Sequence, residues 1–235
     1  MLKNKLLRVI IVLMFLFSVL VPFNGELFAQ NGKYVLVYEN RQEAVESYIK
    51  SGFDVIEVYE SFFYANITHE QEQLLIERNI SYTELKDVGI IKYAGYTFTS
   101  DGAKNMKYPP EIESKLGSYP ADSYSIFLLQ FIGPIKQEWK YELESMDVKF
   151  YFSAPSFAFL VKTKGNNLSS IKEKRFVRTA GYIPPYLKVN KDILDNLQEF
   201  NDINIVATKE LDINKFVNSI GFSKSDVVYS VVGEY

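Results

Sequence analysis

The chain has 235 residues, of which 15% are aromatic, no cysteine, and a formal net charge of −3 at pH 7. Without cysteine it can form neither disulfides nor thiolate metal sites, so apolar packing has to hold the fold together. The small negative net charge argues against a nucleic-acid partner, because binding a phosphate backbone calls for a strongly basic surface.

The N-terminus has the pattern of an export signal. Three basic residues within the first eight precede an apolar run over residues 9–21, and the small residue Ala29 offers a cleavage point. We therefore predict a signal peptide over residues 1–29 and a secreted or otherwise extracytoplasmic product. Leu27 is not the usual small residue three positions before the cut, so the alternative is an uncleaved leader that attaches the chain to a membrane.

The first unit, residues 33–88, shows the order strand, helix, strand, strand, helix, strand. Asn40 is expected to cap the first helix and Gly52 to end it. Thr68 and Gln71 have the spacing of a capping box at the start of the second helix. We expect the strands at residues 34–38, 54–59, 62–67 and 81–85.

Residues 89–122 differ in character, since four glycines and three prolines interrupt every periodic pattern. This segment is predicted to be a connector, and its aromatic side chains suggest that it is held against a surface. The second unit, residues 123–187, repeats the order of the first, with a helix expected from Pro134 to Met146. Trp139 lies in the apolar stripe of that helix and is predicted to be a core residue.

Residues 188–235 read as a partial third unit, which either adds strands to the second unit's sheet or continues into a longer polypeptide. The predicted fold class is α+β, with tandem ferredoxin-like (βαββαβ) units, antiparallel sheets and this partial third unit.

The strand that opens the second unit is apolar on both faces. Phe127, Leu129 and Phe131 point to one face of this strand. The residues between them point to the opposite face, and only one of those is strongly polar. Leaving three such side chains in water would forgo on the order of 5 kcal/mol, so something should cover the second face. It could be the first unit, the connector or a partner protein. The predicted partner-binding residues on this face are Ile126, Leu128, Gln130 and Ile132.

The segment 127–139 (FLLQFIGPIKQEW), together with residues 155–161 (PSFAFLV), resembles the N-terminal pro-region of secreted subtilisin-like serine proteases. In that family the pro-region is a ferredoxin-like domain that docks its sheet on the protease, assists its folding and inhibits it. The resemblance thus implies a subtilisin-like protease domain as partner, in cis or in trans. One departure is that the family's pro-region has one unit, whereas this chain has two and part of a third.

No catalytic, cofactor-binding or metal-binding residues are predicted. A Ser-His-Asp triad needs a suitably placed histidine, and the sole histidine, His69, is expected on the surface of a helix's first turn. The expected function is a non-catalytic exported protein that acts in the folding, inhibition or attachment of a subtilisin-like protease. The alternative is a free-standing extracellular binding or structural protein. An enzyme would require carboxylates converging on His69.

Overall fold

The computed structural model describes residues 32–114, 116–119, 121–184, 187 and 191–195. The chain divides into two compact units, unit 1 up to Leu85 and unit 2 from Lys86 onward. The predicted signal peptide lies outside the described residues. So does the predicted partial third unit, except for residues 191–195, which include the short helix α7 (Lys191–Asp195).

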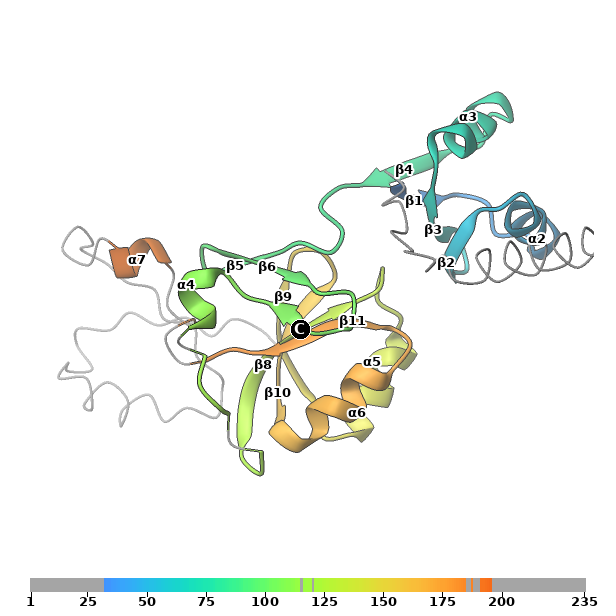
Figure 1. The fold of residues 1–235 in the computed structure, drawn as a ribbon. Coiled ribbons are helices and arrows are strands. Elements are labelled where there is room, and N and C mark those ends of the chain that lie inside the picture. Colours follow the sequence, from blue (N-terminus) through green and yellow to red (C-terminus); the bar gives the residue numbers. More distant parts are fainter. Residues whose placement is uncertain (1–31, 115, 120, 185–186, 188–190, 196–235) are drawn as a thin grey trace, which may run out of the picture. The chain divides into compact units, whose positions relative to one another are not determined.

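Unit 1 is an α+β fold with one four-stranded antiparallel sheet in the order β2-β3-β1-β4 (Figure 1). This is the ferredoxin-like order, in which the first and third strands are central. Both helices share a core with one face of the sheet, built on Val35 and Val37 of the central strand. The elements are β1 (Lys33–Val37), α2 (Gln42–Lys50), β2 (Asp54–Val58), β3 (Phe63–Ile67), α3 (His69–Glu77) and β4 (Tyr82–Leu85).

Two of the three predictions for the helix ends of unit 1 are confirmed, and one is wrong. Thr68 and Gln71 form the predicted capping box of α3, and Gly52 has the left-handed φ of +85° just beyond α2. The prediction that Asn40 caps α2 is wrong, because Arg41 occupies the N-cap position. The Asn40 side chain instead donates a hydrogen bond to the carbonyl oxygen of Glu60, in the β2–β3 turn.

Unit 2 contains a second sheet of the same kind, in the order β11-β8-β10-β9. Its central strands β8 and β10 correspond to β1 and β3 of unit 1, so the tandem ferredoxin-like prediction is confirmed. The elements are β8 (Tyr124–Phe131), α5 (Gln137–Ser145), β9 (Lys149–Ala154), β10 (Ala158–Lys164), the 3-10 turn η1 (Gly165–Asn167), α6 (Leu168–Glu173) and β11 (Val177–Tyr182).

The helix face of this sheet is an aromatic core. Trp139 of α5 is 2% exposed, and its ring is stacked 5.3 Å from that of Phe176 and 6.0 Å from that of Phe131, measured between centroids. Its prediction as a core residue is confirmed. The predicted helix start at Pro134 is wrong, because α5 begins at Gln137 after the N-cap Lys136.

The connector is more regular than its glycines and prolines suggested. It forms β5 (Ile91–Tyr93), β6 (Tyr96–Ser100), β7 (Met106–Lys107) and α4 (Pro110–Glu113), with the three strands in an antiparallel sheet. Ala94 and Gly95 both have positive φ, which suits a two-residue hairpin turn between β5 and β6. The connector is part of unit 2.

Candidate functional site

Three of the four residues predicted to bind a partner, Ile126, Leu128 and Gln130, alternate along β8 on the second face of the unit 2 sheet, opposite α5 and α6. Ile132 follows the end of β8 and packs instead against the core on the helix face. Leu128 and Gln130 are fully buried, while Ile126 and Ile132 are half-buried. Leu128 lies directly across from Leu160 of β10 and Gly181 of β11, in the middle of the sheet.

The connector covers this face. Figure 1 shows β5 and β6 on the side of the sheet opposite α5 and α6. Between the connector and the sheet lies a second apolar core, in which Ile91 and Phe98 are as completely buried as Leu128. The buried members of this core are Ile91, Tyr96, Phe98, Met106, Ile112, Leu128, Ala158, Leu160, Ile183 and Leu187.

Polar contacts fix the connector along strand β11. Lys104 donates from its Nζ to the carbonyl oxygen of Lys174 at 2.7 Å, and its own carbonyl oxygen accepts from the Thr179 hydroxyl at 3.1 Å. Tyr108 donates its hydroxyl to the carbonyl oxygen of Tyr182 at 2.9 Å. The contacts with Lys174 and Tyr182 span 70 or more residues of sequence, so the connector is held down by tertiary contacts and not only by its neighbours in the chain.

Gly181 shows how closely the two layers approach. A Cβ at this position would lie 2.5 Å from the Tyr108 hydroxyl oxygen and 2.6 Å from the Cβ of Met106. Since Cβ atoms do not approach other atoms so closely, β11 can receive the connector here only because residue 181 has no side chain.

These contacts decide between the occupants that the sequence left open for the second face. The connector covers Leu128 and Gln130, and neither side chain has exposed surface to offer to a partner. The two-sided apolar pattern of β8 is therefore accounted for within the chain. It no longer argues that a foreign protein must dock there.

Gln130 has a structural task that the sequence did not reveal. Its Nε2 donates to the carbonyl oxygen of Ser156 at 2.9 Å, in the turn between β9 and β10. Ser156 and Phe157 both have φ near +60°, a conformation that costs free energy for residues other than glycine. The buried amide thus helps to hold a strained turn, which explains a polar residue among the apolar residues in the second half of β8.

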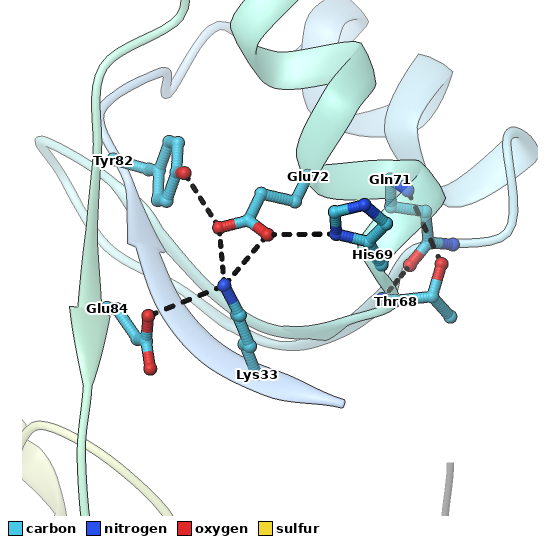
Figure 2. A network of polar contacts seen from close by, with 7 residues as sticks. All are labelled: Lys33, Thr68, His69, Gln71, Glu72, Tyr82 and Glu84. Carbon is cyan, nitrogen blue, oxygen red and sulfur yellow. Dashed lines mark hydrogen bonds and ion pairs between the residues drawn. The ribbon is translucent and has the colours of Figure 1, made fainter. Parts of the chain in front are cut away.

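A second candidate site is the polar cluster around Glu72 in unit 1 (Figure 2). Lys33 donates from its Nζ to both carboxylate oxygens of Glu72 at 2.8 Å, and the Tyr82 hydroxyl donates to Oε1 at 2.8 Å. His69 places its Nδ1 3.5 Å from Oε2. No sequence pattern indicates this cluster, since its members come from three elements, β1, α3 and β4, that only the folded sheet brings together.

The electrostatics of this cluster favour a structural role. The hydrogen bond from Lys33, followed by that from Tyr82, holds the pKa of Glu72 below its ordinary value, and the same contacts raise the pKa of Lys33 and of Tyr82. A carboxylate with a lowered pKa is a poor proton acceptor at neutral pH. The His69 side chain is 74% exposed, as expected for a surface residue. In Figure 2 its ring contacts one carboxylate, that of Glu72.

The chain has three Asn-X-Ser/Thr glycosylation sequons, at Asn66, Asn79 and Asn167, and hydrogen bonds engage the side chain of Asn167. The Asn167 side-chain nitrogen, the atom a glycan would need, donates to the carbonyl oxygen of Met146 at 3.0 Å and to the Thr163 hydroxyl at 3.1 Å. Asn66 lies half-buried in β3.

Within the described ranges, no group of three or more His, Cys, Asp or Glu side chains is placed to hold a metal ion. A search of the same residues finds no helix with the length and apolar character needed to cross a membrane.

Residues 92–184 match a family described as Domain of unknown function (DUF8729). The matched stretch runs from β5 through the end of β11, so it takes in both the connector sheet and the ferredoxin-like sheet that it covers. No curated protein matches the chain, and no solved structure matches it.

Proposed function

We propose that this chain is an exported, non-catalytic protein whose ferredoxin-like units serve as a free-standing extracellular binding or structural protein. The observation that carries the proposal is the closed second face of the unit 2 sheet, where Leu128 and Gln130 are fully buried. A pro-region that docks its sheet on a protease needs that face open. Here the chain uses the face to complete its own core.

Catalysis is a poor fit for the same chain. The sole histidine is largely exposed, and the carboxylate beside it is already bound by Lys33 and Tyr82. A general base works best when its pKa lies near the operating pH, whereas the contacts of Glu72 lower its pKa.

A role in the folding, inhibition or attachment of a subtilisin-like protease is the second candidate. Two observations favour it: the resemblance of residues 127–139 to the pro-region, and the ferredoxin-like strand order of the sheet to which β8 belongs. Any docking on a protease would have to use a surface other than the buried middle of this sheet.

One experiment separates the two candidates. The exported chain, residues 30–235, is added in increasing amounts to a mature subtilisin-like protease, and peptide hydrolysis and the yield of refolded protease are measured. The free-standing role predicts no inhibition and no gain in refolding, while an authentic pro-region gives both in the parallel control. Tight inhibition by the chain would overturn the free-standing role and support the protease helper.

Export is tested separately. Expression of the full chain in a secreting host is expected to deliver it outside the cytoplasm, with Gln30 as the first residue by N-terminal sequencing. Retention in the cytoplasm would contradict the export prediction, and an intact leader on a membrane-bound product would support the uncleaved alternative.

A further inference from the structure

A lysine amine meets a side-chain amide where the connector passes the edge of the unit 2 sheet. Lys172, on α6, donates from its Nζ to Oδ1 of Asn105 at 2.9 Å. The two residues are 67 positions apart in the sequence, so only the folded unit brings them together. An amine and a carboxamide in contact are the reactants of a transamidation, in which the amine replaces the amide nitrogen.

Asn105 is held in place by its backbone and by its side chain. Its backbone forms a parallel bridge with Ala180 of β11, and its N–H donates to Oδ1 of Asp101 at 3.0 Å. The side-chain nitrogen Nδ2 of Asn105 donates to the other carboxylate oxygen, Oδ2, also at 3.0 Å. Asp101 therefore holds the nitrogen end of the amide, and the carbonyl end is left to face Lys172.

Lys172 is half-buried, and its surroundings favour the neutral amine. Burial lowers the pKa of Lys172 from its ordinary value, although the negative charge of Asp101 acts in the opposite direction. A lowered pKa increases the fraction of lysine that is unprotonated at neutral pH, and only the unprotonated amine is a nucleophile. The fold also holds this amine against its target, and well-oriented groups within one molecule reach effective concentrations of about 10⁵ M or more.

The pair joins two layers that lie on opposite sides of the sheet. Helix α6 packs on one face, while Asn105 belongs to the connector, whose strands β5 and β6 cover the other (Figure 1). The contact between Lys104 and Lys174 follows the same route past the edge strand β11. A covalent bond between residues 105 and 172 would fasten the connector around this edge. In a chain without cysteine, no disulfide can do so.

We propose that Lys172 and Asn105 react to form an intramolecular isopeptide bond. Nζ of the neutral amine attacks Cγ of Asn105, the bond from Cγ to Nδ2 breaks, and the nitrogen leaves as ammonia. One proton passes from Nζ to Nδ2 through solvent, which reaches Asn105 because this residue is exposed. The product is a secondary amide, and the reaction consumes no other reagent. Asp101 is a positioning residue that orients the amide. The proposal does not depend on the outcome of the protease assay.

The bond is detected by trypsin digestion of the purified exported chain, followed by tandem mass spectrometry. Trypsin does not cleave after an acylated lysine, so the cross-linked chain yields a branched peptide that joins residues 105–107 to residues 165–174. Its mass is lower than the sum of the two separate peptides by one ammonia, about 17 Da. The mass of the intact chain is not sufficient, because an N-terminal glutamine such as Gln30 also loses ammonia when it cyclises.

Lys172→Arg and Asn105→Ala should abolish the branched peptide, because each removes one reactant. The matched control is Lys174→Arg, a change of the same kind on a neighbouring lysine that binds Glu142, and it should yield the branched peptide in the parent's amount. Lys172→Arg should also unfold at a urea concentration about 1 M or more below that of the parent, because a cross-link that closes a long loop restricts the unfolded chain.

The role of Asp101 is tested by rescue. Asp101→Ala should reduce the yield of the branched peptide, and Asp101→Asn should restore part of it, because asparagine retains an oxygen that can accept from Asn105. The parent digest by itself decides the proposal, whether or not a variant folds. Residues 105–107 recovered only as a separate, unaltered peptide would overturn it. So would a 105–107 peptide that is about 1 Da heavier, since Asn105 would then react with water in place of Lys172.

Discussion

The connector is predicted to be part of the core of unit 2, and Phe98→Ala tests this directly. Phe98 is fully buried between the connector and the sheet, and its ring lies edge-on to that of Tyr108 at 5.9 Å between centroids. Truncation to alanine removes the buried ring and leaves a cavity that two hydrogen-bonded sheets cannot easily fill. The expected loss in the free energy of unfolding is about 3–5 kcal/mol.

The assay uses the single tryptophan of the chain. Trp139 belongs to the core on the opposite face of the same sheet, so its fluorescence reports on unit 2 and does not sense Phe98 through contact. With a urea dependence of about 2 kcal/mol per molar, a loss of about 4 kcal/mol lowers the unfolding midpoint by about 2 M. The shift should appear in the Trp139 signal because the two cores share one sheet.

Thr97→Ala is the matched control, since Thr97 lies beside Phe98 on β6 but is exposed. An exposed substitution of this kind is expected to change stability by less than about 0.5 kcal/mol. If Phe98→Ala left the Trp139 midpoint unchanged, the connector and the sheet would unfold independently, and the argument that the connector completes the core would be refuted.

Three further changes test the local geometry. Gly181→Ala should destabilise unit 2 by about 1–3 kcal/mol, because the new Cβ meets Tyr108 and Met106; a Trp139 unfolding midpoint equal to the parent's would contradict the close approach. Thr68→Ala should cost about 1 kcal/mol and speed amide exchange in α3, and unaltered exchange would refute the capping role. Glu72→Gln should lower the unfolding free energy of unit 1 by about 1–2 kcal/mol at pH 7, followed by hydrogen exchange, with the exposed Glu77→Gln as control. Because the pKa of Glu72 is lowered from the ordinary 4.5, the ionised carboxylate stabilises unit 1 at pH values above 4.5, and this stabilisation is lost as the pH falls through the pKa of the folded state. The unfolding free energies of parent and Glu72→Gln should therefore become equal in strong acid. A difference that persisted there would contradict the ion pair.

The sequence by itself determined the local structure of both units. Alternating apolar residues, the Thr68 to Gln71 spacing and the glycine after α2 each act within a few residues, so the order of helices and strands could be derived from them. Placement of Trp139 in the core followed from the apolar stripe of its helix. Errors arose at Asn40 and Pro134, where side-chain preference at a helix start was overridden by the β2–β3 turn in one case and by a bend after β8 in the other.

Tertiary structure alone decided what covers the sheet and which side chains meet. The apolar pattern of β8 shows that both faces are buried but does not name the covering element, because burial depends on contacts with residues far away in sequence. Contacts such as those of Lys104 with Lys174 and of Tyr108 with Tyr182 settle the matter in favour of the connector. The Glu72 cluster arises in the same way, from a strand register that no short sequence window encodes.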